Sequence, residues 1–409
     1  MVKKIGIILL LIVFISSSVY SDEIDTEEII WKDNFIQASN SKEEPKINSR
    51  SAVVYDRKSK KVIWGKKENE RRPMASTTKI MTAIVVLENA NLDDTVIVSK
   101  KAAGTGGSRL GLKTGDKITI NNLLYGLLLV SGNDAAVVLA EHVSGSVESF
   151  AEKMNQKAEE MNLEDTHFIV PHGLDMENHY TTALELAEMA DYAMNNKKFA
   201  EIVATKVKTI NISGRSKSLI NTNELLGNLE GVNGVKTGFT NGANRCLVTS
   251  VSRNGMNVIA VVLGADTKKD RTRDSVEIIE YAYKNYTIYD LEELIKENYE
   301  DWKNINKKRI EVIRGKNKIL TTKLDKLDNY NIPIKKQDID NLKVEIFALK
   351  EIEAPIYVDD YIGKIIVYNG EEKLYELCIR SDVDMARLTF FDYFYNLLKD
   401  NIVNMEEAM

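Results

Sequence analysis

A serine and a lysine three residues apart stand at the start of an apolar segment. Ser76 and Lys79 belong to the stretch RRPMASTTKIMTAIVVLE, and the residues after Lys79 are almost all apolar. Positions three apart share one face of a helix, so the hydroxyl and the amine can meet. Desolvation disfavours the charged form of a buried lysine, and a neutral amine can act as general base for a neighbouring hydroxyl. The pair therefore indicates an activated serine nucleophile.

Two more motifs follow this pair in order. Ser131-Gly132-Asn133 interrupts an apolar helical run, and Lys236-Thr237-Gly238 stands just before a β-rich run. Short patterns of this kind recur by chance, and further copies of the three occur at 39–42, 113–115 and 252–254. Those copies lie in polar stretches or predicted turns and out of order. The order of the three motifs carries the prediction of a shared site.

Strands and helices must bring these motifs together. Residues 51–66 form two β-rich runs around a polar turn, as in a hairpin. Helical runs occupy 121–143 and 147–161, two β-rich runs span 245–265 around an Asn-Gly turn, and a helical run follows at 272–286. Strands, then helices, then strands predict an α+β fold in which helices flank an antiparallel sheet.

A chain of 409 residues is long enough for two domains and appendages. We assign the catalytic domain to residues 47–286. A strongly charged linker is predicted at 287–306, and short β-type runs at 307–381 predict a C-terminal all-β domain. The last segment, 382–409, carries apolar and aromatic residues at helical spacing, which predicts a terminal amphipathic helix.

The two ends of the chain predict export and membrane attachment. Residues 1–21 combine two lysines, a short apolar core and small residues before a cleavage point, as in a signal peptide, with an uncleaved anchor as the alternative. An acid-rich lead-in at 22–46 is predicted to be flexible. The aromatic stripe of the terminal helix suits peripheral attachment to the outer face of the cytoplasmic membrane. Its many acidic residues would not attract anionic lipids, so a helix that packs on a domain or a partner is the alternative.

Composition excludes several classes of function. A net charge of −6 provides no basic surface for nucleic acid. The two cysteines, Cys246 and Cys378, fall in different predicted domains, so we expect no disulfide framework. We also expect no metal and no cofactor, because metal-ligand spacing is not found among the four histidines, His142, His167, His172 and His179.

The three motifs in this order resemble those of penicillin-binding proteins and β-lactamases. Longer stretches resemble the D-alanyl-D-alanine carboxypeptidases, which are low-molecular-mass penicillin-binding proteins and serine peptidases of the S11 type: PMASTTKIMTA, LLYGLLLVSGNDAA, THFIVPHGLD and GVNGVKTGFTNGANRCLV. The likeness spans about residues 47–286, and the segments beyond it resemble the C-terminal module and membrane anchor of that family. It implies a penicillin-binding fold, a peptidoglycan stem peptide as substrate and β-lactam antibiotics as acylating inhibitors.

The resemblance also implies roles for the motif residues. Ser76 would attack the carbonyl between two terminal D-alanines, and Lys79 would take its proton. Ser131 would relay a proton toward the leaving amine, and Lys236 would tune both groups electrostatically.

Substrate binding is implied for five more residues. Asn133 would bind the substrate amide, and the backbone N–H of Phe239, with that of the nucleophile, would form the oxyanion hole. Thr237 and Arg271 would bind the terminal carboxylate, and Gly238 completes this segment. The chain departs from the family pattern at Val170 and at 243–244. These departures would affect the geometry of loops and not the catalytic residues.

Three other functions share parts of this pattern. A β-lactamase needs a deacylating glutamate, and Glu185 is the nearest candidate by order. Glu185 matches an acidic position of the carboxypeptidase family, however, which favours a structural role. A non-catalytic penicillin-binding scaffold would not need four intact catalytic residues. A transpeptidase, which passes the acyl group to an amine, uses the same residues.

Overall fold

The computed structural model describes residues 44–306, 310–328, 330–395 and 398. The predicted signal peptide, 1–21, and residues 22–43 of the predicted lead-in lie outside the described residues. In chain order the elements of the catalytic domain are β1 (Ser51–Asp56), β2 (Val62–Lys66), the 3₁₀ turn η1 (Ala75–Thr78), α1 (Lys79–Asn89), β3 (Thr95–Ile97), α2 (Lys100–Ala103), β4 (Lys117–Thr119), α3 (Ile120–Leu129), α4 (Asn133–Ser144), α5 (Val147–Glu160), α6 (Ala183–Met194), α7 (Lys197–Val203), β5 (Val207–Ile212), β6 (Arg215–Ile220), β7 (Val232–Thr240), β8 (Asn244–Arg253), β9 (Met256–Ala265) and α8 (Lys268–Asn285).

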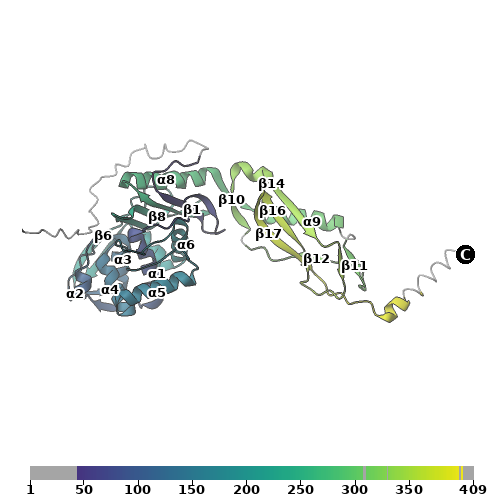
Figure 1. Ribbon diagram of the computed structural model, residues 1–409, viewed down its shortest axis with the longest axis horizontal. Coiled ribbons are helices and arrows are strands. Elements are labelled where there is room, and N and C mark those ends of the chain that lie inside the picture. The colour runs from purple at the N-terminus through teal and green to yellow at the C-terminus, as the bar shows by residue number, and fades with distance from the viewer. Residues whose placement is uncertain (1–43, 307–309, 329, 396–397, 399–409) are drawn as a thin grey trace, which may run out of the picture.

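A five-stranded antiparallel sheet has the strand order β2-β1-β9-β8-β7. Its strands β1 and β8 lie between α8 and the other labelled helices of this domain (Figure 1). Successive residues of a strand point to opposite faces. Val53 and Tyr55 of β1 therefore join the apolar core on one face, and Ala52 and Val54 join the core on the other. Because both faces are buried, the strands appear in the sequence as continuous apolar runs.

Helices cover both faces of the sheet, which confirms the predicted α+β class. Helix α8 packs on β8 and β9 on one face, and α6 packs on β1 and β9 on the other. Helix α1 lies within the layer beyond α6, in contact with α3, α4 and α5. Its residues from Lys79 to Val86 are all buried, as predicted from an apolar run without a polar face.

The C-terminal domain contains β10 (Tyr286–Asp290), α9 (Leu291–Asn306), β11 (Glu311–Ile313), β12 (Thr322–Leu324), β13 (Asn331–Lys335), the 3₁₀ turn η2 (Lys336–Asn341), β14 (Leu342–Ala348), β15 (Glu351–Glu353), β16 (Tyr361–Asn369) and β17 (Glu372–Ser381). Its main sheet has the order β12-β17-β16-β14. Strand β10 pairs with β13, and β11 pairs in parallel with β15.

The prediction of a linker at 287–306 is wrong. The segment forms β10 and α9, and Leu291, Ile295 and Tyr299 are buried in the core of the C-terminal domain. These positions are four apart and share one face of the helix, whereas the charged residues occupy the other. The high charge therefore marks the solvent face of an amphipathic helix that packs on the strands of the C-terminal domain.

The predicted start of the anchor helix at 382 is too early. Met385 is buried and its backbone pairs with Ile356, and Arg387 pairs with Gly315, so this part completes the C-terminal domain. Helical structure begins at Phe390. Residues 399–409 of the predicted helix lie outside the described residues. No helix among the residues that the structure describes is both long and apolar enough to cross a membrane.

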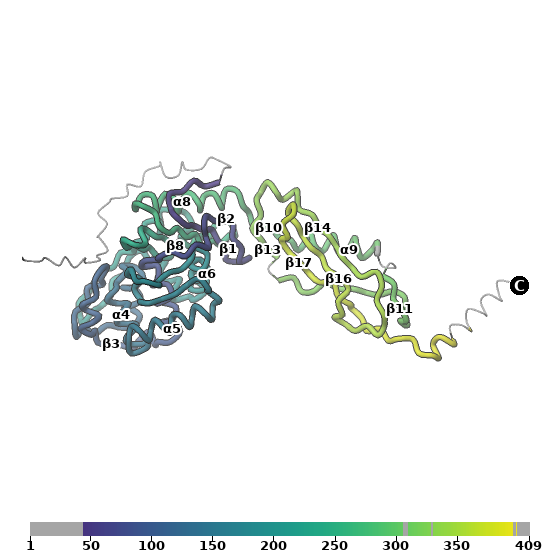
Figure 2. Tube along the Cα trace, viewed as in Figure 1, coloured from purple at the N-terminus to yellow at the C-terminus, as the bar shows by residue number. Residues whose placement is uncertain are grey.

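Two lysines join the domains. Lys61 Nζ, beside β2, donates to the Leu374 carbonyl at 2.8 Å. Lys336 Nζ donates to the carbonyls of Tyr283 and Lys284 in the last turn of α8, at 3.1 Å and 2.9 Å. A lysine there suits the negative end of the helix dipole. The terminal segment leaves the C-terminal domain at the end remote from the catalytic domain (Figure 2).

Candidate active site

Ser76 and Lys79 meet where η1 runs into α1. Lys79 is completely buried, and its Nζ lies 2.7 Å from Ser76 Oγ, 2.7 Å from Asn133 Oδ1 and 2.6 Å from the carbonyl oxygen of His172. The oxygens of Asn133 and His172 can only accept hydrogen bonds. Two N–H groups of the amine therefore point to these oxygens, and the serine hydroxyl is another neighbour of the same amine.

The segment 171–174 presses against the turn that carries the nucleophile. Gly173 has a φ of +82°, and a Cβ there would lie 1.9 Å from the carbonyl oxygen of Ala75. Only glycine permits this approach. Ala75 itself has a φ of +48°, a conformation that an alanine keeps only when its surroundings hold it. Thr82 Oγ1 adds a hydrogen bond to the Pro171 carbonyl at 2.6 Å.

Ser131-Gly132-Asn133 forms the turn between α3 and α4. Ser131 has a φ of +60° and is 7% exposed, and it lines the same cleft as Ser76. Within the described part of the chain its Oγ makes no hydrogen bond. Asn133 Nδ2 donates to the Gly106 carbonyl at 2.8 Å, so its amide is oriented from both ends. The turn therefore presents one hydroxyl without a protein partner to the cleft.

Asp134, the next residue, has a role that the sequence did not indicate. Its fully buried carboxylate accepts hydrogen bonds from the backbone of Leu110 at 2.7 Å, Gly111 at 2.8 Å and Leu112 at 2.9 Å. Such bonds to an ionised acceptor are among the stronger ones. They tie α4 to the segment whose preceding residues, 107–109, line the cleft.

Strand β7 forms the wall opposite the α3–α4 turn. A Cβ on Gly238 would lie 3.2 Å from the backbone nitrogen of Ser76, so this strand runs directly beside η1. Lys236 is 1% exposed, and its Nζ donates to the Thr237 carbonyl at 2.8 Å. The hydroxyl groups of Thr237 and Thr222 lie 2.8 Å apart. The third motif thus lies against the first.

Cationic side chains gather at one end of the cleft. Arg271, in the first turns of α8, lines the cleft, but its guanidinium is hydrogen-bonded to Glu224, which also accepts from Thr272 Oγ1 at 2.9 Å. Arg245 and Lys268 line the same end, and Arg245 stacks on the Phe239 ring at 4.3 Å. Of these three cations, the sequence prediction named only Arg271. Many lysines and arginines follow strands in the sequence, and only the folded chain shows which of them line the cleft.

The cleft between these walls has a volume of about 620 Å³. It is lined by Ser76, Gly107, Ser108, Arg109, Val130, Ser131, Thr222, Thr237, Gly238, Phe239, Arg245, Lys268 and Arg271. Asn133, Lys79 and Lys236 lie just beneath this surface. The structure therefore brings together all three motifs that the sequence order predicted.

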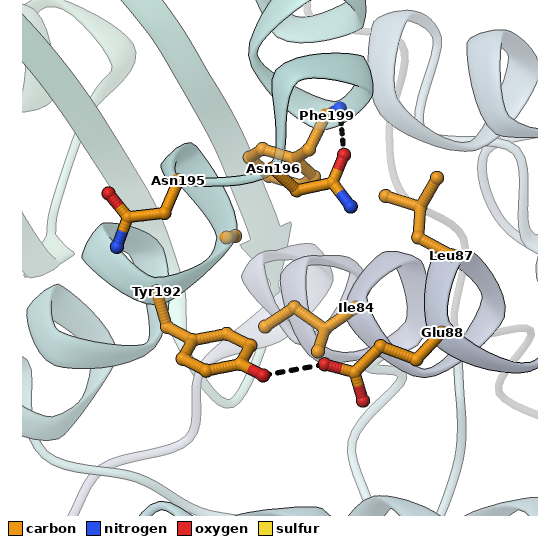
Figure 3. A pocket seen from close by; sticks show the side chains of 8 residues that line it. Ile84, Leu87, Glu88, Tyr192, Asn195, Asn196 and Phe199 are labelled. Atoms are coloured by element: carbon orange, nitrogen blue, oxygen red, sulfur yellow. Dashed lines mark hydrogen bonds between the residues drawn. The ribbon is translucent and has the colours of Figure 1, made fainter.

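A second pocket, of about 280 Å³, lies beside the C-terminal half of α1 (Figure 3). Ile84, Leu87 and Phe199 supply apolar side chains, and Tyr192 donates to Glu88 at 2.7 Å. None of the motif residues lines this pocket. A nucleophile and a base are found in the larger cleft instead.

Glu185 has contacts that explain it structurally. It lies in the first turn of α6, where its backbone N–H donates to the capping Thr182 Oγ1 at 3.1 Å. Its carboxylate accepts from Asp165 N at 2.8 Å and from Thr166 Oγ1 at 2.5 Å. It is absent from the lining of the cleft. The Glu185 side chain therefore ties the start of α6 to the segment at 165–166.

Two histidines beneath the turn η1 are held neutral. Burial, followed by the smaller effect of the protonated form of Lys79, lowers the pKa of His172 to about 3. Burial, followed by His167 and Lys79, lowers the pKa of His179 to about 4. Among the residues that the structure describes, no group of three or more His, Cys, Asp or Glu side chains is placed to hold a metal ion.

Comparisons with known proteins identify the family of the chain. The family model described as D-alanyl-D-alanine carboxypeptidase matches residues 38–267, and that of the penicillin-binding protein 5 C-terminal domain matches residues 290–389. The D-alanyl-D-alanine carboxypeptidase DacF of Bacillus subtilis is 33% identical over 86% of this chain and 90% of its own. DacD of Escherichia coli is 30% identical over 82% of this chain and 86% of its own.

Solved structures show the same overall fold. Penicillin-binding protein 5 of Haemophilus influenzae superposes with a TM-score of 0.68 at 25% identity, over 84% of this chain and 99% of its own. The DD-transpeptidase of Streptomyces K15 superposes with a TM-score of 0.57 at 35% identity, over 59% of this chain and 99% of its own. With its three motifs in one cleft and both family models matched in order, the chain belongs to the D-alanyl-D-alanine carboxypeptidase family of low-molecular-mass penicillin-binding proteins.

Proposed function

We propose that this protein removes the terminal D-alanine from peptidoglycan stem pentapeptides through an acyl-enzyme on Ser76. The contact between Lys79 and Ser76 carries the proposal. A neutral lysine amine has two protons and one lone pair. The two protons satisfy the oxygens of Asn133 and His172, and the lone pair is left for the Ser76 proton. The buried surroundings of Lys79 favour this uncharged form.

Acylation follows from this arrangement. Ser76 Oγ attacks the carbonyl carbon between the two D-alanines, and its proton passes to Lys79. The backbone N–H groups of Ser76 and Phe239 stabilise the oxyanion, which is supported by the close approach of β7 to η1. The C–N bond then breaks, and the leaving amine receives a proton through Ser131, with the charge of Lys236 assisting. Water hydrolyses the ester and restores Ser76.

The cationic end of the cleft would bind the terminal carboxylate of the substrate. Thr237, Arg245 and Lys268 would supply donors, and Arg271 would contribute while paired with Glu224. Asn133 has a second N–H on its amide, which would bind the substrate carbonyl next to the attacked bond.

The rival functions fit less well. The carboxylate of Glu185, the candidate deacylating residue of a β-lactamase, is bound by Asp165 and Thr166 and is absent from the cleft. A non-catalytic scaffold would not need the Lys79–Ser76 contact. A transferase remains a candidate because the Streptomyces K15 relative is a DD-transpeptidase by name.

We also propose that the protein is exported and attaches peripherally to the membrane through its terminal helix. Five aromatic side chains near the start of this helix are exposed, namely Phe390, Phe391, Tyr393, Phe394 and Tyr395. Aromatic side chains suit the membrane interface. The apolar segment near the N-terminus supports export.

Mass spectrometry of a pentapeptide ending in D-Ala-D-Ala tests the activity. After incubation with the purified protein, we expect loss of one alanine. A product in which the acyl group is joined to an added amine, with no hydrolysed peptide, would identify a transferase instead. An unchanged peptide, together with no labelling by a fluorescent penicillin, would overturn the enzymatic proposal.

A further inference from the structure

The peptide unit between Ala75 and Ser76 has a carbonyl and an N–H group that face different partners. A trans peptide unit is planar, and its C=O and N–H point in opposite directions. The N–H of Ser76 is a proposed oxyanion donor and lies on the side of β7. The carbonyl of Ala75 belongs to the same plane and accepts a hydrogen bond from Thr78 Oγ1 at 2.7 Å. Whatever holds this carbonyl therefore also aims the N–H of Ser76.

His179 determines where the Thr78 proton points. The backbone N–H of Ile169 donates to His179 Nδ1 at 3.0 Å, so Nδ1 is an acceptor and the ring proton is on Nε2. Nε2 lies 2.8 Å from Thr78 Oγ1 and donates to it. A hydroxyl has one proton, and that of Thr78 goes to Ala75. The chain of donors thus runs from Ile169 through His179 and Thr78 to the carbonyl of Ala75.

We propose that His179 is a positioning residue for the oxyanion hole: acting through Thr78, it fixes the plane of the Ala75–Ser76 peptide and so directs the Ser76 N–H at the reacting carbonyl. The inference rests on the proposed function and adds to it a residue outside the three motifs. His179 touches neither the nucleophile nor the cleft surface around Lys236 and Arg271.

The surroundings of His179 support this role. The side chain is 5% exposed, and its ring meets the edge of Phe168 at 5.9 Å, so the imidazole is held in one orientation. Its pKa is lowered to about 4, first by burial, so the ring is neutral at neutral pH. A protonated ring would carry N–H groups on both nitrogens, and one of them would oppose the N–H of Ile169. Ala75, with its positive φ, also needs such support.

Thr78→Val and Thr78→Ser test the first link. Valine keeps the shape of threonine and removes the hydroxyl, whereas serine keeps the hydroxyl. Thr82→Val is the matched control, because Thr82 of α1 bonds to the carbonyl of Pro171 and makes no hydrogen bond to the Ala75–Ser76 peptide. Active sites are counted with a labelled penicillin, and turnover of the D-Ala-D-Ala peptide is expressed per labelled site.

We expect Thr78→Val to lose about tenfold to a hundredfold in kcat per site, with KM little changed, since a misdirected donor costs less than the about 10²–10³ of a removed one. The affinity for a D-alanine boronic acid, whose tetrahedral adduct places an oxygen in the oxyanion hole, should fall by the same factor. Thr78→Ser and Thr82→Val should keep the wild-type rate per site.

His179→Gln and His179→Leu test the second link. Glutamine places an amide N–H near the position of Nε2, so it should rescue most of the activity that His179→Leu loses. Normal turnover and boronate affinity per site in Thr78→Val, or equal losses in His179→Gln and His179→Leu, would overturn the inference. A wild-type protein that releases no D-alanine would instead overturn the proposed function.

Discussion

The Nζ atom of Lys79 lies 2.7 Å from the Oγ atom of Ser76, and the lysine has no exposure to solvent. Lys79→Arg would place a permanent positive charge beside Ser76 and remove the base, because a guanidinium does not deprotonate in proteins. We expect the folded variant, like Ser76→Ala, to lose covalent labelling by a fluorescent penicillin. Lys42→Arg, in the second Ser-x-x-Lys copy, should label normally. Rapid labelling of a folded Lys79→Arg protein would show that another group is the base.

Ser131→Ala should affect chemistry far more than stability. Its Oγ makes no hydrogen bond within the described residues, so its removal should change the free energy of unfolding by about 1 kcal/mol or less. Loss of the proton relay should lower kcat by about 10²- to 10⁴-fold. Ser144→Ala is the matched control, because Ser144 Oγ also makes no hydrogen bond in the described chain and lies at the other end of α4. Wild-type turnover in Ser131→Ala would exclude the relay.

Substitutions of two cations of the cleft, Arg271 and Lys268, should differ in their effects on substrate binding and on stability. Arg271→Gln breaks a buried pair and leaves the charge of Glu224 without its partner, so we expect about 3 kcal/mol of destabilisation together with a higher KM. Lys268→Gln should raise KM for the peptide acid and lower the urea midpoint less than Arg271→Gln does. Neither variant should alter KM for a peptide with an amidated C-terminus. An equal rise for the acid and the amide would place the carboxylate elsewhere.

Stability should fall with pH below the normal range of histidine. The pKa of His172 is lowered from 6.5 to about 3 and that of His179 from 6.5 to about 4. Between pH 6.5 and about 4 the unfolded chain binds protons that the folded chain does not, so unfolding takes up protons and stability drops as the pH drops. Each histidine contributes up to about 1.4 kcal/mol per pH unit. Urea titrations give the free energy of unfolding at each pH. Its slope against pH should differ between wild type and His179→Gln by that amount in the upper part of this range, and equal slopes would contradict the prediction.

Truncation after Leu388 should release the protein from membranes and leave hydrolysis intact. This end point preserves the pairs of Met385 and Arg387 inside the C-terminal domain. High salt should release little of the full-length protein, because the contact would be apolar rather than ionic. The triple variant Phe390→Ser, Phe391→Ser and Phe394→Ser should behave like the truncated protein. Continued sedimentation of the truncated protein with membranes, after proof that residues 1–21 are removed, would refute the anchor.

Local patterns in the sequence predicted strands β1, β2, β8 and β9 of the central sheet but not β7, which contains the third motif. The apolar run after Lys79 predicts burial because it lacks a polar face, and the order of the three motifs predicts that they meet. Helix α9 was missed because its charges lie on one face and its apolar residues are few. Asp134, Arg245 and Lys268 were missed for another reason. Their roles depend on partners distant in sequence, which only the folded chain brings within reach.

The sheet order described above has a consequence for how the chain folds. Strand β1 pairs with β9, so the first and last strands of the catalytic domain are neighbours in the sheet. The nucleophile and the helices around it come between these two strands in the sequence. Such non-local pairing makes folding slow, because a long loop must close before the contact forms. Strand β7, which borders the oxyanion hole, is held in place by β8 and β9. A nascent chain that ends before β9 therefore has its serine and lysine but no assembled catalytic cleft, so activity appears only after synthesis of the whole domain.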